Sequence, residues 1–461
     1  MSFLIPLYLG YVAYQQHERL KLGKYDETIS LEGKTVIPLS KQEQSFAIYE
    51  FPMTTITFCD GNYQNIRLYL QQRIADIIAK NPWMGGWLIR DVHDDLKVKI
   101  YYDKDGKDLC QGHFQVLDNH DTVVSLSRDK TKYTEYPQIL QQVGALLPGN
   151  SELIGKDRPF WKVSVIPDCD APQERFALVM SLSHAVGDIQ TYYKLYQMLD
   201  KDATIDQLDP TRDPNYQDRL VDMIGEKEAT YFRSAIQNPI IDLTGASDEK
   251  CVFKLFYVDP DWILTRKSRR ASVFDPETTM SEASVVSANS TLTSWFFNLN
   301  QASIGLMSIN LRSRLDGCEI GNLSAGNYVH PIIYQPSDYQ TPGLIQESVK
   351  GLRRCGPEAD QDLPDFGWNM TSSLSINWAT YFHEELYLHD DVQTKLHIPL
   401  LNVPLLRKLP NRVSLLLNFT ANPNGIDGSE RRTAAFVICR ESVWEQIKKS
   451  GIIEEMIAED I

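Results

Sequence analysis

Residues 176–199 read FALVMSLSHAVGDIQTYYKLYQML, and this stretch determines how the rest of the chain can be arranged. Seven mostly apolar residues, 176–182, lie just before His184, and so short an apolar run beside a loop is typical of a buried strand. Gly187 follows in a tight connection, where a glycine is free to take a positive φ angle. Asp188 then occupies the N-cap position of a helix. The sequence therefore predicts that His184 ends a strand and that Asp188 begins a helix.

A helical repeat follows this aspartate. Apolar and aromatic side chains recur at helical spacing, at Ile189, Tyr192, Tyr193, Tyr196 and Leu199. A strand end is a rigid place to hold a histidine, and rigid placement is what a general base requires. The same spacing is compatible with a core histidine beside a helix cap, and taken alone it favours that structural interpretation. Other segments of the sequence are needed to decide between the catalytic and the structural interpretation of His184.

The composition is that of a globular protein. The chain has 461 residues, of which 43% are hydrophobic and 23% are charged, enough for two or three domains with a sizeable core. The formal net charge is −15 and the isoelectric point is about 5.1, whereas general nucleic-acid binding needs a basic surface. A local basic pocket for an anionic ligand is still compatible with this charge.

Cysteine usage and hydropathy indicate the compartment. Seven cysteines are scattered and never in CxxC spacing, which indicates free thiols in a reducing compartment and no structural zinc or other metal site. No run approaches about eighteen consecutive apolar residues, so we expect no transmembrane helix. The apolar N-terminus, residues 1–14, lacks a basic segment and a cleavage site. We expect it to dock on the domain of a cytoplasmic protein; a membrane-surface role or a signal peptide is less favoured.

Strand and helix patterns alternate before the histidine. We expect strands within residues 45–58, where Pro52 interrupts the pattern, and an amphipathic helix at 66–78. Further strands are expected at 83–89, 96–102 and 161–165. A polar loop at 167–174 should join the last of these to the strand of His184 as a hairpin. Polar residues 200–216 then lead out of the first half.

The second half repeats this mixture. Strands are expected at 252–258, 304–309, 329–334, 413–419 and 434–439, and helices near 292–299 and 443–447, the last ended by Gly451. A Ser/Thr/Glu-rich stretch, 271–291, is expected to be a mobile crossover. The sequence therefore predicts an α/β fold with two sheet-containing halves.

Two short motifs resemble the signatures of the BAHD acyltransferases. The HxxxD pattern at 184–188 resembles the first signature, and the segment DFGWN at 365–369 resembles the DFGWG motif of that family. Both lie in the order that the family has. Other segments that resemble it are AKNPWMGGWL (79–88), PFWKVSVI (159–166), INLRSR (309–314) and AGNYV (325–329), so the resemblance covers nearly the whole chain.

This resemblance implies the chloramphenicol acetyltransferase-like fold. Two α/β domains, each a mixed sheet flanked by helices, would enclose a channel with the HxxxD motif at its centre; we expect them at residues 1–216 and 217–461. The resemblance also implies acyl-CoA as co-substrate, a small-molecule alcohol or amine as acceptor, and no permanently bound cofactor. Because the two halves supply both walls of the site, we expect a monomer.

The sequence departs from the family pattern at three positions. Ile189 stands where the family usually has glycine after the aspartate, and it would either narrow the channel or pack inward with the tyrosines of the helix. Asn369 replaces the last glycine of DFGWG, and Asn310 replaces an aspartate before the arginines.

The resemblance assigns His184 as the general base. An unperturbed imidazole has a pKa of about 6.5, so it is mostly neutral at cellular pH and can take the acceptor's proton during attack on the thioester. No covalent acyl-enzyme is implied. Asp188 is expected to turn away from the acceptor and to pair with Arg312, and Gly187 is expected to shape the loop between them.

Other residues receive supporting roles. Trp368 carries an indole N–H that can donate to an oxyanion, although core packing explains it equally well. Asp365 and Gly367 are expected to shape their loop. Thr371 and Ser372 are expected to contact the acyl-CoA.

The phosphates of CoA need a basic site on this acidic protein. A basic cluster lies where the resembling family places contacts to the CoA nucleotide, and a solvated run of charges is the competing interpretation. The cluster consists of Arg266, Lys267, Arg269 and Arg270.

Two other functions compete with this one. A condensation-like enzyme would take its acyl group from a carrier protein, but such domains usually have a second histidine where this chain has Ser183. A non-catalytic member of the fold would bind a ligand or partner, as Ile189 and Asn369 suggest, although the retained histidine and both motifs favour catalysis.

Overall fold

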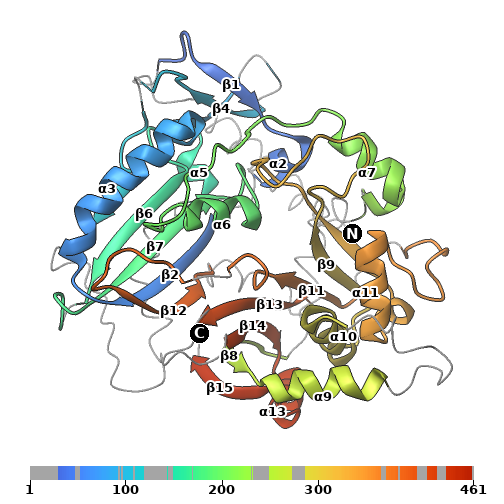
Figure 1. The fold of residues 1–461 in the computed structure, drawn as a ribbon. Helices are drawn as coiled ribbons and strands as arrows, with labels where there is room; N and C mark the ends of the chain where they lie inside the picture. Colours follow the sequence, from blue (N-terminus) through green and yellow to red (C-terminus); the bar gives the residue numbers. More distant parts are fainter. Residues whose placement is uncertain are drawn as a thin grey trace, which may run out of the picture.

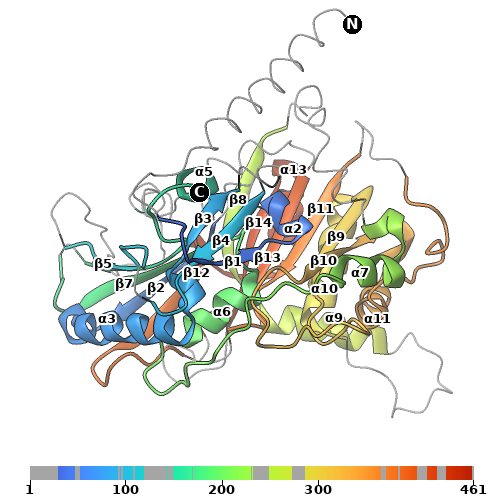
Figure 2. The same ribbon diagram turned by 90° about the horizontal axis from the view of Figure 1, so that it is seen from above.

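The protein is described here by a computed structural model of the chain. It describes residues 30–46, 52–91, 94, 97–106, 109–118, 143, 149–168, 170–229, 231, 249–271, 286–364, 370–382, 385–401, 413–422 and 432–458. These residues form two large sheets and one small sheet, and the two large sheets lie side by side with their helices (Figure 1, Figure 2).

The first large sheet carries the histidine. Its strands lie in the order β12 (Gln393–Pro399), β2 (Pro52–Asp60), β7 (Arg175–Ser183), β6 (Trp161–Pro167) and β5 (Phe114–Val116). The predicted hairpin is confirmed, because β6 and β7 pair antiparallel from Trp161 opposite Leu182 to Pro167 opposite Phe176. Eight of the nine residues of β7 are buried, as expected for a strand covered on both faces.

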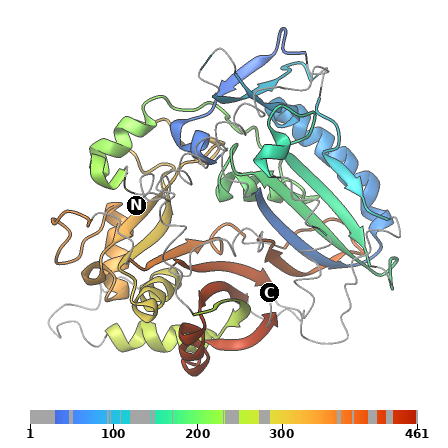
Figure 3. The same cartoon turned by 180° about the vertical axis from the view of Figure 1, so that it is seen from behind.

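Helices cover both faces of this sheet. The helices α3 (Tyr63–Lys80) and α6 (Ile189–Gln197) lie on opposite sides of it (Figure 1, Figure 3). Buried residues of α3 recur at helical spacing, and Asn62 caps the helix by accepting a hydrogen bond from the backbone N–H of Gln64. The 3-10 helix η1 (Pro82–Gly85) follows α3, where the sequence had predicted the beginning of a strand.

A small sheet and short helices flank the first half. The small sheet has the order β1 (Thr35–Pro38), β4 (Val98–Tyr102) and β3 (Trp87–Arg90). The helix α2 (Lys41–Phe46) precedes β2, and α5 (Asn150–Leu153) precedes β6. The prediction of a strand from residue 45 was therefore wrong at its start, since Ser45 and Phe46 belong to α2.

The second large sheet is mixed. Its order is β10 (Val329–Tyr334), β9 (Ile304–Asn310), β11 (Ser372–Asn377), β13 (Val413–Asn422), β14 (Arg432–Arg440), β8 (Cys251–Val258) and β15 (Ile453–Ala458). β11 runs parallel to both β9 and β13, and the other pairs are antiparallel. The helices around it are α7 (Tyr216–Ile224), α9 (Pro260–Ala271), α10 (Ala288–Asn300), η4 (Pro336–Asp338), α11 (Pro342–Gly351) and α13 (Glu441–Lys449).

This second sheet separates two apolar cores. Leu417 and Phe436 belong to the core that contains α6, whereas Leu416 and Val437 belong to the core under α9, α10 and α13. Because successive side chains of a strand point to opposite faces, neighbouring residues of β13 and β14 contribute to different cores. Figure 1 shows the same layering, with β13 between α6 and the helices α9 and α13.

One strand crosses between the halves. β12 comes from the C-terminal part of the chain but pairs antiparallel with β2, from Gln393 opposite Asp60 to Pro399 opposite Thr55. The expected division at residue 216 did not anticipate that a strand from the second half would belong to the first large sheet. Both halves of the chain therefore contribute strands to this sheet.

Two more expectations need correction. The segment 271–291 overlaps α10, which begins at Ala288, and residues 272–285 lie outside the described residues. Gly451 takes a φ of 74° after α13, as predicted for a helix end, but β15 follows it and adds an edge strand. Within the described ranges, none of the helices combines the length and the apolar character needed to cross a membrane.

Candidate active site

His184 lies directly after the last residue of β7. Its neighbour Ser183 donates its backbone N–H to the carbonyl oxygen of Phe160 at 2.8 Å, which keeps the strand end paired. The helix α6 begins at Ile189, and Asp188 is its N-cap. The predicted strand end and helix start are therefore both confirmed.

Gly187 is needed for a reason that the sequence did not reveal. Its φ is not in the left-handed region, contrary to the prediction. A Cβ atom at this position would lie 2.8 Å from both Cβ and Cγ2 of Thr191. The turn therefore packs against the first turn of α6 at a distance that only a residue without a side chain allows.

Asp188 uses both carboxylate oxygens within the fold. The guanidinium group of Arg312 donates to Oδ2 from Nη1 at 2.6 Å and to Oδ1 from Nη2 at 3.0 Å. The backbone N–H groups of Thr191 and Tyr328 donate to Oδ1 and Oδ2 at 3.1 and 3.0 Å. Both ionic side chains are buried, with exposed fractions of 0% and 1%. The expected pairing of Asp188 with Arg312 is thus present as a buried, bidentate ion pair.

Backbone carbonyl groups of the segment before β10 also hold the side chain of Arg312. Beyond Asp188 it donates to the carbonyl oxygens of Ser324 and Gly326, each at 2.9 Å. The next residue, Ser313, has a φ of 57°, an uncommon conformation for a residue other than glycine. The backbone N–H of Ser313 donates to Ile320 at 2.7 Å, which holds this conformation.

The pKa of His184 is lowered from its usual value, chiefly because burial desolvates the charged imidazolium. The carboxylates of Asp188 and Glu43, together with hydrogen bonds in the loop, act in the opposite direction. The imidazole is therefore neutral at cellular pH and able to accept a proton. The residue as a whole is neither fully buried nor exposed, and its Nδ1 atom is buried.

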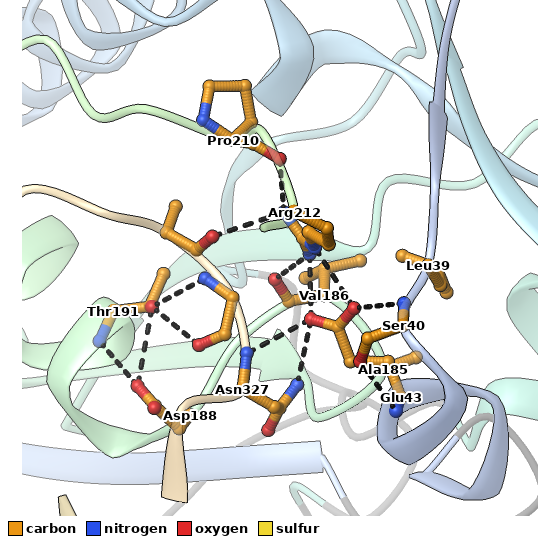
Figure 4. Close-up of polar contacts among 12 residues, drawn as sticks. Leu39, Ser40, Glu43, Ala185, Val186, Asp188, Thr191, Pro210, Arg212 and Asn327 are labelled. Atoms are coloured by element: carbon orange, nitrogen blue, oxygen red, sulfur yellow. Dashed lines mark hydrogen bonds and ion pairs between the residues drawn. The ribbon is translucent and has the colours of Figure 1, made fainter. Parts of the chain in front are cut away.

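A second buried ion pair touches the same turn. Figure 4 shows Glu43 of α2 against Arg212 and Asn327, whose backbone N–H donates to Glu43 at 3.0 Å. We did not predict these residues. One signal was present: Ser40 and Glu43 form a capping box in which Ser40 N–H donates to Oε2 at 2.8 Å and Glu43 N–H to Oγ at 3.2 Å. The S-x-x-E pattern that encodes it is visible in the sequence.

The tryptophan motif, with Asp365, Gly367, Trp368 and Asn369, lies outside the described residues. Downstream, Thr371 is engaged locally: its hydroxyl oxygen accepts from the backbone N–H of Ser303 at 3.0 Å and donates to the carbonyl oxygen of Gln301 at 3.1 Å.

Ser372 is buried at the beginning of β11, opposite the beginning of β9. Arg312 follows the other end of β9. With a rise of about 3.3 Å per residue, the two ends are roughly 20 Å apart. The structure therefore does not bring Thr371 and Ser372 together with the Asp188–Arg312 pair.

The basic cluster lies on the helix α9. Arg266 stacks on the indole ring of Trp262, with 3.8 Å between its guanidinium carbon and the ring centroid. It also lines a pocket of about 470 Å³ between α9, α10 and α13. Lys267 follows it in α9, and the side chains of Arg269 and Arg270 lie outside the described residues.

The basic helix and the histidine belong to different faces of the second sheet. Trp262 of α9 packs in one apolar core, and Ile189 of α6 packs in the other. The structure therefore does not bring the predicted CoA-binding cluster next to His184.

Comparisons with known proteins concern the fold. A scan against protein-family models and a search of curated proteins each found no match. Among solved structures, the first condensation domain of the CDA synthetase is 10% identical with a TM-score of 0.54, over 93% of this chain and 99% of that one. Vinorine synthase is 13% identical with a TM-score of 0.53, over 95% and 97%. TRI101 of F. sporotrichioides, solved with coenzyme A and T-2, is 10% identical with a TM-score of 0.53, over 90% and 97%.

At such identities the likeness shows the fold alone. Together with the two mixed α/β halves described above, it establishes the chloramphenicol acetyltransferase-like fold that the resemblance implied. What this fold does in the present chain has to be inferred from its own residues.

Proposed function

We propose that this protein transfers an acyl group from acyl-CoA to a hydroxyl or amine group of a small molecule. His184 acts as the general base and removes the acceptor's proton as the acceptor oxygen or nitrogen attacks the thioester carbonyl. The carbon–sulfur bond then breaks, and the imidazolium returns the proton to the departing CoA sulfur. The products are the acylated acceptor and free CoA, and no acyl-enzyme forms.

One observation carries this proposal: a neutral imidazole at a strand end, next to an aspartate that is fully used elsewhere. Asp188 is bound by Arg312, Thr191 and Tyr328. This arrangement favours a single base over a relay of the Ser-His-Asp kind, in which the aspartate orients the imidazole. TRI101 shares the fold and was solved with coenzyme A, which supports acyl-CoA as the donor.

A thiol-release assay tests the proposal. Purified protein is mixed with acyl-CoA esters and candidate alcohols and amines, and CoA release is followed with DTNB. We expect acceptor-dependent release that falls by about 10²- to 10⁴-fold in His184→Ala, the usual contribution of a general base. His389→Ala is the matched control, because His389 is a partly exposed histidine outside the His184 turn, where it accepts a hydrogen bond from the backbone N–H of Asp391. Equal release by His184→Ala and wild type would reject the assignment.

The similarity to a condensation domain favours a second candidate. In that case the acyl group comes from the phosphopantetheine arm of a carrier protein, and the same histidine serves as base. Comparing an acylated carrier protein with the corresponding acyl-CoA at equal concentration separates the two. Faster transfer from acyl-CoA supports the first proposal.

CoA binding is assigned to the basic helix α9. Arg266, Lys267, Arg269 and Arg270 offer positive charge for its phosphates. Trp368 remains a proposed donor to the oxyanion, and Thr371 and Ser372 remain proposed contacts to the CoA molecule away from the Asp188–Arg312 pair. Arg266 already lines a pocket at the surface of the helical layer. Since α9 and His184 lie on different faces of the second sheet, an extended CoA molecule has to reach around an edge of that sheet.

A further inference from the structure

Glu43 and Arg212 form an ion pair far from either motif in the sequence. Nε of Arg212 donates to Oε2 of Glu43 at 2.9 Å, and Nη2 donates to Oε1 at 2.8 Å. The side chains are 1% and 6% exposed. Glu43 comes from α2 near the beginning of the described chain, and Arg212 comes from the segment that joins α6 to α7.

The pair reaches the histidine turn by two routes, one direct and one through Asn327. Nη2 of Arg212 donates to the carbonyl oxygen of Val186 at 2.9 Å. Glu43 accepts the backbone N–H of Asn327 at 3.0 Å, and the amide of Asn327 donates to the carbonyl oxygen of His184 at 2.9 Å. The carbonyl groups of His184 and Val186 are thus both fixed from outside the motif. Figure 4 shows the contact between Arg212 and Val186.

The other end of the same turn is fixed by the first ion pair. Asp188 is held by Arg312, and its backbone N–H donates to the carbonyl oxygen of Gly326 at 3.1 Å. Arg212 donates to the neighbouring carbonyl oxygen of Ala325 at 3.1 Å. Residues 325–327 therefore lie between two buried arginines, one for each end of the turn.

Stability alone is a poor explanation for this second pair. Burying two charges costs desolvation that their attraction often does not repay, and apolar residues of similar size frequently stabilise a protein as well or better. What the pair does supply is a fixed geometry, because each hydrogen bond to a backbone carbonyl limits how the turn can move. A base that must meet an acceptor proton needs such fixed geometry.

We propose that the Glu43–Arg212 ion pair is a positioning device for His184, acting through Asn327 and through the carbonyl group of Val186. This inference rests on the proposed function, in which His184 is the base. It identifies Glu43 and Arg212 as positioning residues that do not touch the reacting atoms.

The pair also sets the electrostatic surroundings of the base. The negative charge of Glu43 raises the pKa of His184 against the larger lowering by burial. Replacing it by glutamine removes that charge, so the pKa of His184 should fall further and the acidic limb of the pH–rate profile should move to lower pH. In the part of the chain that the structure describes, the charged and titratable groups around the turn include Glu43, Asp188, Arg212, Tyr216, Arg312, Tyr328 and Tyr381.

The test compares Glu43→Gln with wild type and with a matched control. Arg354→Gln is that control, because Arg354 is a buried arginine paired with Asp338 and Glu228, outside the His184 turn. In Glu43→Gln we expect kcat to fall about ten- to a hundredfold with little change in KM, since a small misplacement of a catalytic group has effects of that size. Arg354→Gln should keep kcat and the pH profile of the wild type.

A second measurement does not depend on activity. In protein labelled at histidine Cε1, the NMR signal of His184 is identified by its loss in His184→Ala and is titrated with pH. We expect its chemical shift and pKa to change in Glu43→Gln and to stay unchanged in Arg354→Gln. If wild-type protein showed no acyl transfer, the proposed function would be rejected. The titration would still show whether Glu43 positions His184.

A double variant covers the case in which Glu43→Gln does not fold. Glu43→Gln/Arg212→Met removes both charges together, so neither is left buried without its partner. We expect this variant to fold and to keep the low kcat and the altered His184 titration. Wild-type kcat and titration in either variant would overturn the positioning role.

Discussion

At the scale of single residues, two departures from the BAHD pattern have local explanations. Ile189 is 8% exposed and packs in the same core as Tyr192 and Tyr193, which agrees with the inward interpretation of the helical repeat. Asn310 accepts from Nη1 of Arg312 at 3.2 Å, and its amide donates to Gln190 of α6. Asn310, which is neutral where the family has an aspartate, thus links Arg312 to the helix α6.

We expect Arg312→Met to reduce the free energy of unfolding by about 3–5 kcal/mol, because it leaves the carboxylate of Asp188 buried without its partner. Urea denaturation measures the loss. The double variant Asp188→Asn/Arg312→Met should recover part of it, since no buried charge remains. A loss below about 1 kcal/mol in the single variant would contradict a role for this pair in the fold, as exposed ion pairs have that size. Low activity in an Asp188 variant would not by itself show a chemical role.

At the scale of elements, α6 is anchored by hydroxyl groups on its buried face. The hydroxyl groups of Tyr192 and Tyr196 lie 2.6 Å from those of Thr55 and Thr57 of β2. The ring of His397 on β12 joins the network, with Nδ1 2.8 Å from Thr57 Oγ1 and Nε2 3.0 Å from the hydroxyl of Tyr193. The sequence marked these tyrosines as an apolar helix face, whereas the structure shows that their polar ends tie the helix to both halves.

Stability should depend on pH through His397. Burial lowers its pKa to about 3, from an ordinary value of about 6.5. Between these values the unfolded chain binds a proton that the folded protein does not, so stability is lost as pH falls from about 6.5 towards 3. At pH 5 the loss from this group is about 2 kcal/mol relative to neutral pH.

Urea denaturation at pH 7 and pH 5 checks this expectation. The difference between the two pH values should be smaller in His397→Gln than in wild type by about 2 kcal/mol. Some difference should persist in the variant, because burial lowers the pKa of His113 to about 4 in the same way. The same pH dependence in variant and wild type would mean that His397 is not held neutral.

At the scale of the whole molecule, the two halves do not only contact each other: a strand from the C-terminal part of the chain belongs to the sheet of the first half. β12 extends the first large sheet from the C-terminal part of the chain. The aromatic side chains of Trp378, Tyr381 and Phe382, which follow β11, pack around Tyr193 with ring centroids 5.9–6.4 Å away. The helix that follows His184 is therefore held by both halves.

Charge reversal on α9 tests where acyl-CoA binds. We expect Arg269→Glu/Arg270→Glu to raise the KM for acyl-CoA several-fold with little change in the KM for the acceptor, because the change removes attraction for the phosphates alone. Steady-state kinetics in both substrates measures this. Lys448→Glu/Lys449→Glu on α13 changes the net charge equally and should have a smaller effect. Equal effects on both substrates would reject the assignment.

Much of the architecture could be predicted from local patterns. The bounds expected for β10 and β9 agree with the structure to within a residue, and the strand end at His184 and the cap at Asp188 are as expected. These features depend on periodicity, turn residues and capping side chains, which act over a few positions. The strand expected from residue 45 failed because the capping box at Ser40 was missed.

The sequence by itself determined the alternation of strands and helices, the position of the histidine at a strand end and the fold that the paired motifs imply. Only the tertiary structure decided that Gly187 is required by close packing, that Glu43 and Arg212 meet behind the histidine turn, and that β12 returns to the first sheet. The physical reason is range: a cap or a repeat is set by neighbours in the chain, whereas a buried charge finds its partner through the folding of segments more than a hundred residues apart, as Glu43 and Arg212 do, 169 positions from each other.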